Sequence, residues 1–580
     1  MTEDEKNQRN TRNWPRLVLG ALSGALAGFS ALAVAELVSA WVRPQAGPVI
    51  AVGGAAIDRT PAGVKDWAIR NFGTNDKLIL QLGILAILTV FALVLGSFAL
   101  RFRRVGAAGV LVFGIVGAAA ATSRPDSTGL ADALPSVVGA VVGAVVLYVL
   151  IGRLTLQGRP AVPDSPPLSG RPTASDRPTA SDRPAASDRP AASDRRTASG
   201  TTAGPVAETT NGSAGASGWD RRGFVIAASA AAVASAGAGA LGRVLSGSRG
   251  QEAIASRKEI VLPAPASAAP AVPRGTQLRL PGVSSYMTSN GDFYRVDTAL
   301  VVPKVDATSW RLRIHGKGVG RPVTLSFDDL LRRRLIERNI TLTCVSNEVG
   351  GPYVGNARWI GVRLADLLTE CGVKPPSRGG PADQLVARSV DGMTIGSPVE
   401  DVMDGRDALL ALGMNGQPLP FEHGFPVRMV VPGLYGYVSA CKWITDIELT
   451  TFDSYDTYWV KRKWARKAPI KTQSRIDTPK PFARPEAGTV MVAGVAWAQH
   501  RGIDKVELRV DDGPWQEARL AAEDSRDTWR QWSFAWKAAK GSHTLTVRAT
   551  DRTGRVQTEK RARTIPDGAS GRHSVVVTVG

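Results

Sequence analysis

Four long apolar runs in the N-terminal part of the chain restrict its fold more than any other feature. They are Leu17–Val42, Leu78–Leu100, the short Gly- and Ala-rich Val105–Ala121, and Leu134–Ile151. About 20 apolar residues are enough for a helix to cross the hydrocarbon core of a bilayer. Helices of a water-soluble core would carry a polar face, which these runs lack. The sequence therefore predicts four membrane spans within residues 17–151, after a cytoplasmic tail of residues 1–16.

Clusters of arginine mark the ends of these runs. They precede the first run, separate the second from the third, and follow the fourth: Arg9, Arg12, Arg16, Arg101, Arg103, Arg104, Arg153 and Arg159. In a hairpin arrangement of four spans, these three positions share one side of the membrane. Basic flanks are typical of the cytoplasmic side. We therefore predict a multi-pass protein of the cell membrane with this side in the cytoplasm.

A low-complexity stretch follows the fourth run. The hexad R-P-[TA]-A-S-D repeats over residues 171–194. Proline, serine and alanine with alternating charge cannot bury a core, so we predict a disordered linker over residues 152–220.

An arginine pair ends this linker. Arg221 and Arg222 precede the weakly hydrophobic run Val225–Leu241, a pattern that resembles an internal twin-arginine export signal. A plain fifth span with a basic flank is the alternative interpretation for residues 221–245. Both interpretations place everything after Arg243 outside the cytoplasm, and small residues in the run leave cleavage open.

The remaining chain reads as an external linker over residues 246–285 and then two domains. Ser309–Gly316 alternates like a strand, whereas Leu325–Arg334 and Val362–Gly372 carry helix signals, so an α+β domain is expected over residues 286–465. From Pro485 onward, short alternating strands are separated by Asp-Gly and Gly-Ser turns. This pattern predicts a β-sandwich within residues 466–580.

Two segments of the α+β region carry the chemistry. In RNITLTCVSNEVGG, Cys344 ends a β-branched run before a glycine-bearing turn, where a thiol can bind a soft metal or act as a nucleophile. A buried structural cysteine is the plainer alternative. The second segment, MNGQPLPFEHGFPVRMVVPGLYGYVSACKW, is dense in Gly and Pro and holds His423, Arg428 and Lys442. These three side chains suit a ligand that carries a phosphate.

The motifs TLTCVSN, NGQPLP, HGFPVR, VPG and KW together resemble the signature of the sulfite oxidase family of molybdopterin enzymes, from about Tyr286 to the C-terminus. The resemblance implies a molybdenum–molybdopterin cofactor with Cys344 as the metal ligand, and an immunoglobulin-like dimerisation domain, hence a homodimer. It implies a set of catalytic residues: Cys344, Arg295, Arg501 and Trp464. It also implies a set of cofactor-binding residues: Tyr294, Arg295, Asn347, His423, Arg428 and Lys442.

Two departures from the family pattern concern the substrate. Glu348 and Val349 follow Asn347 where the sulfite enzymes have a basic pair, and Trp464 replaces their active-site tyrosine. A lost cation and a gained carboxylate disfavour a doubly charged anion. We expect oxygen-atom transfer on a small substrate outside the cytoplasmic membrane, such as reduction of a neutral or zwitterionic S- or N-oxide. Sulfite oxidation remains the alternative.

Composition bears on the partners. The net charge is +20, yet the basic residues are dispersed and no nucleic-acid module is recognisable. All five histidines lie after the predicted spans and the cysteines form no cluster, so we expect neither a haem nor an iron–sulfur centre. Electrons would then pass through a separate cytochrome, quinone system or soluble carrier. Two other classes are open: a cofactor-free extracellular adhesion protein, and a transporter, although Glu36 is the one ionisable residue well inside a span.

Overall fold

Long helices occupy the predicted membrane region in the computed structural model, which describes residues 3–61, 64, 76–124, 127, 129–155 and 220–580. The hexad repeats lie outside the described residues. The helices of this region are α1 (Glu3–Val42), α2 (Pro48–Arg59), α4 (Asp76–Ala99), α5 (Arg103–Thr122), α6 (Leu134–Thr155) and α7 (Arg221–Glu259). Within the described residues, five helices are long and apolar enough to cross a membrane, at each predicted position. The short helix α2 was not predicted.

Small residues let these helices approach closely. A Cβ atom on Gly24 of α1 would lie 2.0 Å from the carbonyl oxygen of Ala92 in α4, so only glycine fits there. Helix α7 packs on α1, where the Ser235 and Ser30 hydroxyls are 2.7 Å apart. Small residues at helix contacts are typical of membrane bundles, which explains the weak hydrophobicity of the Ala- and Gly-rich α7.

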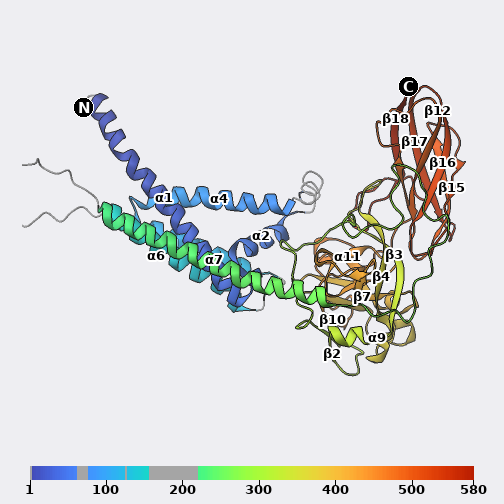
Figure 1. Ribbon diagram of the computed structural model, residues 1–580, viewed down its shortest axis with the longest axis horizontal. Coiled ribbons are helices and arrows are strands. Elements are labelled where there is room, and N and C mark those ends of the chain that lie inside the picture. Colours follow the sequence, from blue (N-terminus) through green and yellow to red (C-terminus); the bar gives the residue numbers. More distant parts are fainter. Residues whose placement is uncertain (1–2, 62–63, 65–75, 125–126, 128, 156–219) are drawn as a thin grey trace, which may run out of the picture.

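Helix α7 also joins the bundle to the soluble part. It continues beyond the predicted residue 245 to Glu259, and runs from the bundle to the α+β domain (Figure 1). At its C-terminal end, Arg257 donates to the carbonyl oxygens of Leu419 (2.7 Å) and Pro418 (2.8 Å). The stretch predicted as an external linker is therefore partly helical and packed. Its extended part also pairs with the soluble domain, because Ser267 bridges to Ile336.

Two five-stranded mixed or antiparallel sheets form the α+β domain. The first has the order β2-β1-β10-β5-β6, with β1 and β10 parallel, and the second has the order β3-β4-β7-β8, with β9 paired to β7. The strands are β1 (Arg311–Gly316), β2 (Val323–Ser326), β3 (Leu335–Thr343), β4 (Val354–Arg363), β5 (Gln384–Ser389), β6 (Thr394–Pro398), β7 (Leu409–Met414), β8 (Gln417–Pro418), β9 (Arg428–Val430) and β10 (Ile444–Thr450). The helices are α8 (Phe327–Leu331), α9 (Leu364–Glu370), α10 (Val399–Met403) and α11 (Gly436–Ser439). The predicted α+β class agrees with this arrangement.

The two predicted helices of this domain are shorter than expected. Helix α8 begins only at Phe327, after a capping box formed by Ser326 and Asp329, because Leu325 and Ser326 complete β2. Helix α9 begins only at Leu364, because Val362 and Arg363 complete β4. In both cases strand pairing overrides local helix propensity.

Two four-stranded antiparallel sheets make the C-terminal part. Their orders are β11-β12-β16-β15 and β14-β13-β17-β18, and one apolar cluster lies between them, with Trp532 and Val506 fully buried. The strands are β11 (Gln473–Thr478), β12 (Gly488–Trp497), β13 (Ile503–Val510), β14 (Gln516–Glu517), β15 (Arg519–Leu520), β16 (Arg530–Ala538), β17 (Gly541–Asp551) and β18 (His573–Val579). The predicted β-sandwich is present, while its immunoglobulin-like character stays a prediction.

Candidate functional site

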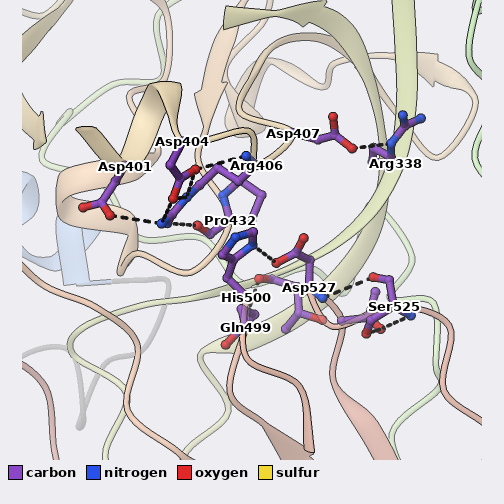
Figure 2. Close-up of polar contacts among 12 residues, drawn as sticks. Arg338, Asp401, Asp404, Arg406, Asp407, Pro432, Gln499, His500, Ser525 and Asp527 are labelled. Carbon is purple, nitrogen blue, oxygen red and sulfur yellow. Dashed lines mark hydrogen bonds and ion pairs between the residues drawn. The ribbon is translucent and has the colours of Figure 1, made fainter. Parts of the chain in front are cut away.

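Cys344 lies directly after strand β3, and the β-sandwich fixes the exposed edge of that strand. The amide N–H of Thr341 donates to the Asp527 carbonyl oxygen at 3.0 Å. Gln499 Nε2 donates to the Thr341 carbonyl oxygen (3.0 Å) and to Thr343 Oγ1 (2.9 Å). Gln499, His500 and Asp527 lie together at this contact (Figure 2). The C-terminal domain thus positions the strand that presents the thiol.

A tight loop then turns the chain after Cys344. The Asn347 N–H donates to the Cys344 carbonyl oxygen at 3.0 Å, and Asn347 Oδ1 accepts from the Tyr353 N–H at 2.8 Å. Gly350 adopts a φ of 80°, and a Cβ atom there would lie 2.3 Å from Cδ2 of His573 in β18. Asn347 therefore serves the loop itself, and the sandwich packs against the loop through His573.

Gly350→Ala should destabilise the loop by about 2–4 kcal/mol, since it combines left-handed strain with a clash against His573. Gly379→Ala is the matched control, because Gly379 has a φ of 79° but open space around it. That change should cost only about 1–2 kcal/mol from the backbone. Thermal melting of both variants checks this. Equal losses of stability would show that the clash with His573 adds nothing to the backbone strain.

One cavity of about 320 Å³ gathers most of the predicted site residues. Its lining includes six of them: Cys344, Tyr294, His423, Arg428, Lys442 and Trp464. Arg295, Asn347 and Arg501 are not among the described residues that line it. Arg501 instead donates to Asp551 at 2.8 Å and to the Ile470 carbonyl oxygen at 2.8 Å, within the C-terminal part.

His423 and Arg428 are brought together by the glycine between them. Gly424 has a φ of 108°, and a Cβ atom there would lie 3.0 Å from Cβ of Arg428 and 3.1 Å from Cα of Lys442. The HGFPVR motif therefore needs its glycine for the close approach of Arg428 and Lys442. Arg428 Nη1 donates to the His423 carbonyl oxygen at 3.1 Å, and its guanidinium lies 5.0 Å from the ring of Trp359.

Burial controls the charge of both side chains. It lowers the pKa of His423 to about 4, so the imidazole is neutral, and its Nε2 donates to the Asn290 carbonyl oxygen at 2.8 Å. Nδ1 is then an acceptor. Burial also lowers the pKa of Arg428 to about 10, which still leaves the guanidinium charged at neutral pH. Its buried Nε has no hydrogen-bond partner among the described residues.

A buried carboxylate, Asp297, gathers three cations beside the cavity. Lys442 Nζ lies 2.9 Å from Asp297 Oδ2, Lys77 Nζ bonds to Oδ1, and Arg295 Nε lies 3.2 Å from Oδ2. Burial opposes ionisation of Asp297, but the attraction of Lys442 and Lys77 outweighs it and holds its pKa below the ordinary value. Sequence reasoning found Arg295 and Lys442 but missed Asp297 and Lys77. The signal was present, since Asp297 follows Arg295 by two residues and Lys77 starts an apolar run.

Aromatic side chains form another part of the lining. Trp464 is 6% exposed and packs on Tyr437 and Trp459, with ring centres 5.5 and 6.0 Å apart. The Tyr437 hydroxyl donates to the Ala465 carbonyl oxygen at 2.7 Å. Burial raises the pKa of Tyr294, which therefore remains a neutral phenol. The cavity thus pairs a thiol and buried cations with an apolar, aromatic wall.

Because His423 is buried and neutral, we expect the free energy of unfolding to fall in acid. Its pKa is about 4 in the folded chain and 6.5 when exposed, so the unfolded chain binds more protons between these values. Stability is complete above pH 6.5 and falls as the pH drops, by about 2 kcal/mol at pH 5. His573, whose pKa burial also lowers to about 4, acts in the same direction. The difference in melting temperature between pH 7 and pH 5 should shrink in His423→Gln, and an unchanged difference would contradict this assignment.

Comparison with known proteins agrees with the site. The family described as "Oxidoreductase molybdopterin binding domain" matches residues 299–459. Mitochondrial sulfite oxidase of Rattus norvegicus is 31% identical over 291 residues, covering 43% of this chain and 53% of that protein. The human enzyme is 30% identical over 304 residues, covering 45% and 55%. The chain therefore spans about half the length of these relatives.

Two further similarities complete the comparison. The uncharacterized oxidoreductase YuiH of Bacillus subtilis is 34% identical over 154 residues, covering 27% of this chain and 71% of that protein. A crystal structure of the sulfane dehydrogenase SoxCD from Paracoccus pantotrophus aligns with a TM-score of 0.44 and 25% identity, over 51% of this chain and 84% of that one. On the family match and the relatives together, the chain belongs to the sulfite oxidase family of molybdopterin-dependent oxidoreductases.

Proposed function

We propose that the chain is a membrane-anchored molybdopterin-dependent oxidoreductase that performs oxygen-atom transfer on a small substrate outside the cytoplasmic membrane. One observation carries the proposal. The cavity that holds the Cys344 thiol also holds a buried arginine, Arg428, whose Nε lacks a partner among the described residues. A buried, charged donor without a partner is costly, and an anionic or acceptor-rich ligand removes that cost. An adhesion module would need neither feature.

The residues present fit a molybdopterin cofactor. Thiolate is a suitable ligand for a soft transition metal, and Cys344 would hold the molybdenum. Arg428 would donate to the oxygen-rich pterin and phosphate, with Lys442 as a second positive charge. His423, being neutral, would accept a hydrogen bond at Nδ1, and Tyr294 would donate one from its hydroxyl.

The chain's own residues bind and orient the cofactor and the substrate, and they exclude water from the cavity. When bound, the cofactor supplies two-electron redox chemistry and oxygen exchange with the substrate. The packed rings of Trp464, Tyr437 and Trp459 keep the cavity wall apolar. A low-dielectric wall strengthens the field of Arg428 at the substrate. Gln499 and Asn347 act indirectly, by holding the strand and loop that carry Cys344.

The charge balance favours a neutral or zwitterionic substrate. Lys442 and Lys77 both bond to Asp297, which offsets their charge. Trp464, in place of a phenol, offers no hydroxyl to an anion. These features support reduction of a small S- or N-oxide over oxidation of the sulfite dianion. Purified protein should therefore oxidise reduced methyl viologen with dimethyl sulfoxide or trimethylamine N-oxide. Ferricyanide reduction by sulfite at a higher rate would favour the alternative.

The arrangement of the helices supports an extracytoplasmic catalytic domain. The catalytic domain contacts the bundle at the end where α4 begins and α7 finishes (Figure 1). The basic flanks lie at the other end, where Arg153 pairs with Asp220 at 2.8 Å, just before α7. If those flanks are cytoplasmic, the catalytic domain is outside.

Protease added to intact cells should remove the catalytic domain and spare an epitope placed within residues 171–194. Removal of that epitope with the catalytic domain left intact would refute the topology.

We further propose that Arg221 and Arg222 form a twin-arginine export signal, so their joint replacement by lysine should block export. Unchanged export of the lysine variant would leave a plain fifth span.

Two more features belong to this proposal. The C-terminal β-sandwich is proposed to be immunoglobulin-like and to form a homodimer, which analytical ultracentrifugation in detergent would test. Electrons are proposed to pass through a separate partner, because the five candidate spans contain no histidine to ligate a haem.

A further inference from the structure

The membrane region supplies one wall of the cavity. Ile57 of α2, Thr60 just after it, and Lys77 and Leu80 of α4 line the same cavity as Cys344. The catalytic domain alone therefore leaves this cavity incomplete. We did not predict from the sequence that the apolar helices take part in the cavity.

Polar contacts at two points, Asp58 and Lys77, fix this wall in place. The Tyr458 hydroxyl donates to Asp58 Oδ1 at 2.5 Å, and Arg462 Nη2 lies 3.5 Å from the same carboxylate oxygen. Burial and the nearby Asp58 carboxylate raise the pKa of Tyr458, so it stays a neutral donor. On the other side, Lys77 bonds to Asp297 and donates to the Ala299 carbonyl oxygen at 2.6 Å. Both contacts adjoin the lining, because Trp459 and Thr298 are cavity residues.

The outer surface of this wall is apolar and exposed. On α4, Leu78, Ile79 and Leu82 are 54%, 42% and 57% exposed, whereas Leu80 of the same turn lines the cavity. The α4 span has a mean hydropathy of 2.8, the highest of the five candidate spans, and none of its most hydrophobic window is buried. A surface suited to hydrocarbon thus reaches the cavity within one helical turn.

The lining of the membrane end suits a flat, lipid-soluble ring. Trp459 follows the Tyr458 that bonds to Asp58 of α2, and it lines the same cavity as Ile57 and Leu80. We call the part of the cavity between these three side chains the slot. Aromatic rings stack well on such a surface. Thr60 Oγ1, which donates its proton to the Ala56 carbonyl oxygen at 2.6 Å, can accept a hydrogen bond from a ring hydroxyl at the edge of the slot.

Resting on the proposed function, we propose that the slot between α2, α4 and Trp459 binds a hydroquinone from the bilayer, which is the electron donor of the enzyme. The overall reaction balances without another reactant. The hydroquinone loses two electrons and two protons and becomes the quinone. The S-oxide gains them, its sulfur–oxygen bond breaks, and the products are the sulfide and water. A two-electron donor matches a two-electron oxygen transfer.

The test uses the full chain in lipid nanodiscs with two probes, an azido-ubiquinone for photolabelling and decylubiquinol as donor. Labelling should fall on peptides of α2, α4 or Trp459, and unlabelled decylubiquinone should compete it away. Leu80→Trp fills the slot, and Leu82→Trp, on the exposed face of the same helix, is the matched control. Leu80→Trp should lower labelling at least about tenfold, and should lower quinol-driven turnover about tenfold more than viologen-driven turnover. Leu82→Trp should leave the labelling, the quinol-driven turnover and the viologen-driven turnover unchanged.

The outcomes separate this inference from the proposed function. If the protein reduces the oxide with viologen, but decylubiquinone does not compete with photolabelling of the slot, the inference is wrong and the proposed function stands. Equal effects of Leu80→Trp and Leu82→Trp overturn it as well. Absence of viologen-driven reduction in protein with a full molybdenum content overturns the proposed function, and the inference falls with it.

Discussion

Cys344→Ser should lower oxygen-atom transfer by at least about a thousandfold, equivalent to ~4 kcal/mol of transition-state stabilisation. Serine differs from cysteine by one atom, so the 8% exposed position after β3 should remain filled. The hydroxyl is a poorer ligand than a thiolate for a soft metal and is not ionised at neutral pH. Viologen-linked turnover and metal analysis of the same preparation measure the effect.

Cys371→Ser is the control for this prediction. Cys371 is also buried, at the end of α9, and does not line the cavity in the described residues. Its replacement should leave turnover near that of the parent chain and cost about 1–3 kcal/mol of stability, because a buried hydroxyl needs a partner. An active Cys344→Ser protein with full metal content would mean that the thiol is structural.

Asp297→Asn should destabilise the chain by about 3–5 kcal/mol, the usual cost of removing one partner from a buried ion pair. The carboxylate is 1% exposed, and its loss leaves the 10% exposed Lys442 and the 17% exposed Lys77 facing each other without a counter-charge. Asparagine keeps the shape, so lost charge is the cause. The melting temperature measures the loss of stability. The amount of pterin that stays bound after purification measures the effect on the cavity, where α4 meets the α+β domain.

Asp407→Asn supplies the matched comparison. Asp407 also bridges two arginines, Arg338 and Arg363, but it is 24% exposed and is not among the described residues that line the cavity. Figure 2 shows its contact with Arg338. Water reaches this carboxylate, so its loss should cost less stability than the loss of the 1% exposed Asp297 carboxylate, and the variant should melt closer to the parent chain. Equal losses for the two variants would mean that the burial of Asp297 contributes nothing special.

Local patterns explain how much of the fold was predictable. The five long apolar helices were predicted because hydropathy over some 20 residues is a local property. Helix α2 was missed because its 12 residues, PVIAVGGAAIDR, are too few and too rich in glycine for such a signal. The helices α8 and α9 were predicted too long, since the pairing of β2 with β1 and of β4 with β7 delays their first residues.

The site shows the same division. Motifs predicted Cys344, His423, Arg428 and Lys442, because their spacing within one loop or strand end fixes their neighbourhood. Arg501 instead forms an ion pair with Asp551, fifty residues away in the chain, and no local sequence pattern indicates that pair. Lys77 and Asp297 are separated by 220 residues, so the membrane wall of the cavity emerges only in the folded chain.

The central claim is that the cavity beside Cys344 holds molybdopterin, and the most direct measurement is cofactor stoichiometry. The full chain, purified from a host that makes the cofactor, should contain about one molybdenum by plasma mass spectrometry and about one pterin by fluorescence after oxidation. Folded protein from that host with neither molybdenum nor pterin would contradict the account.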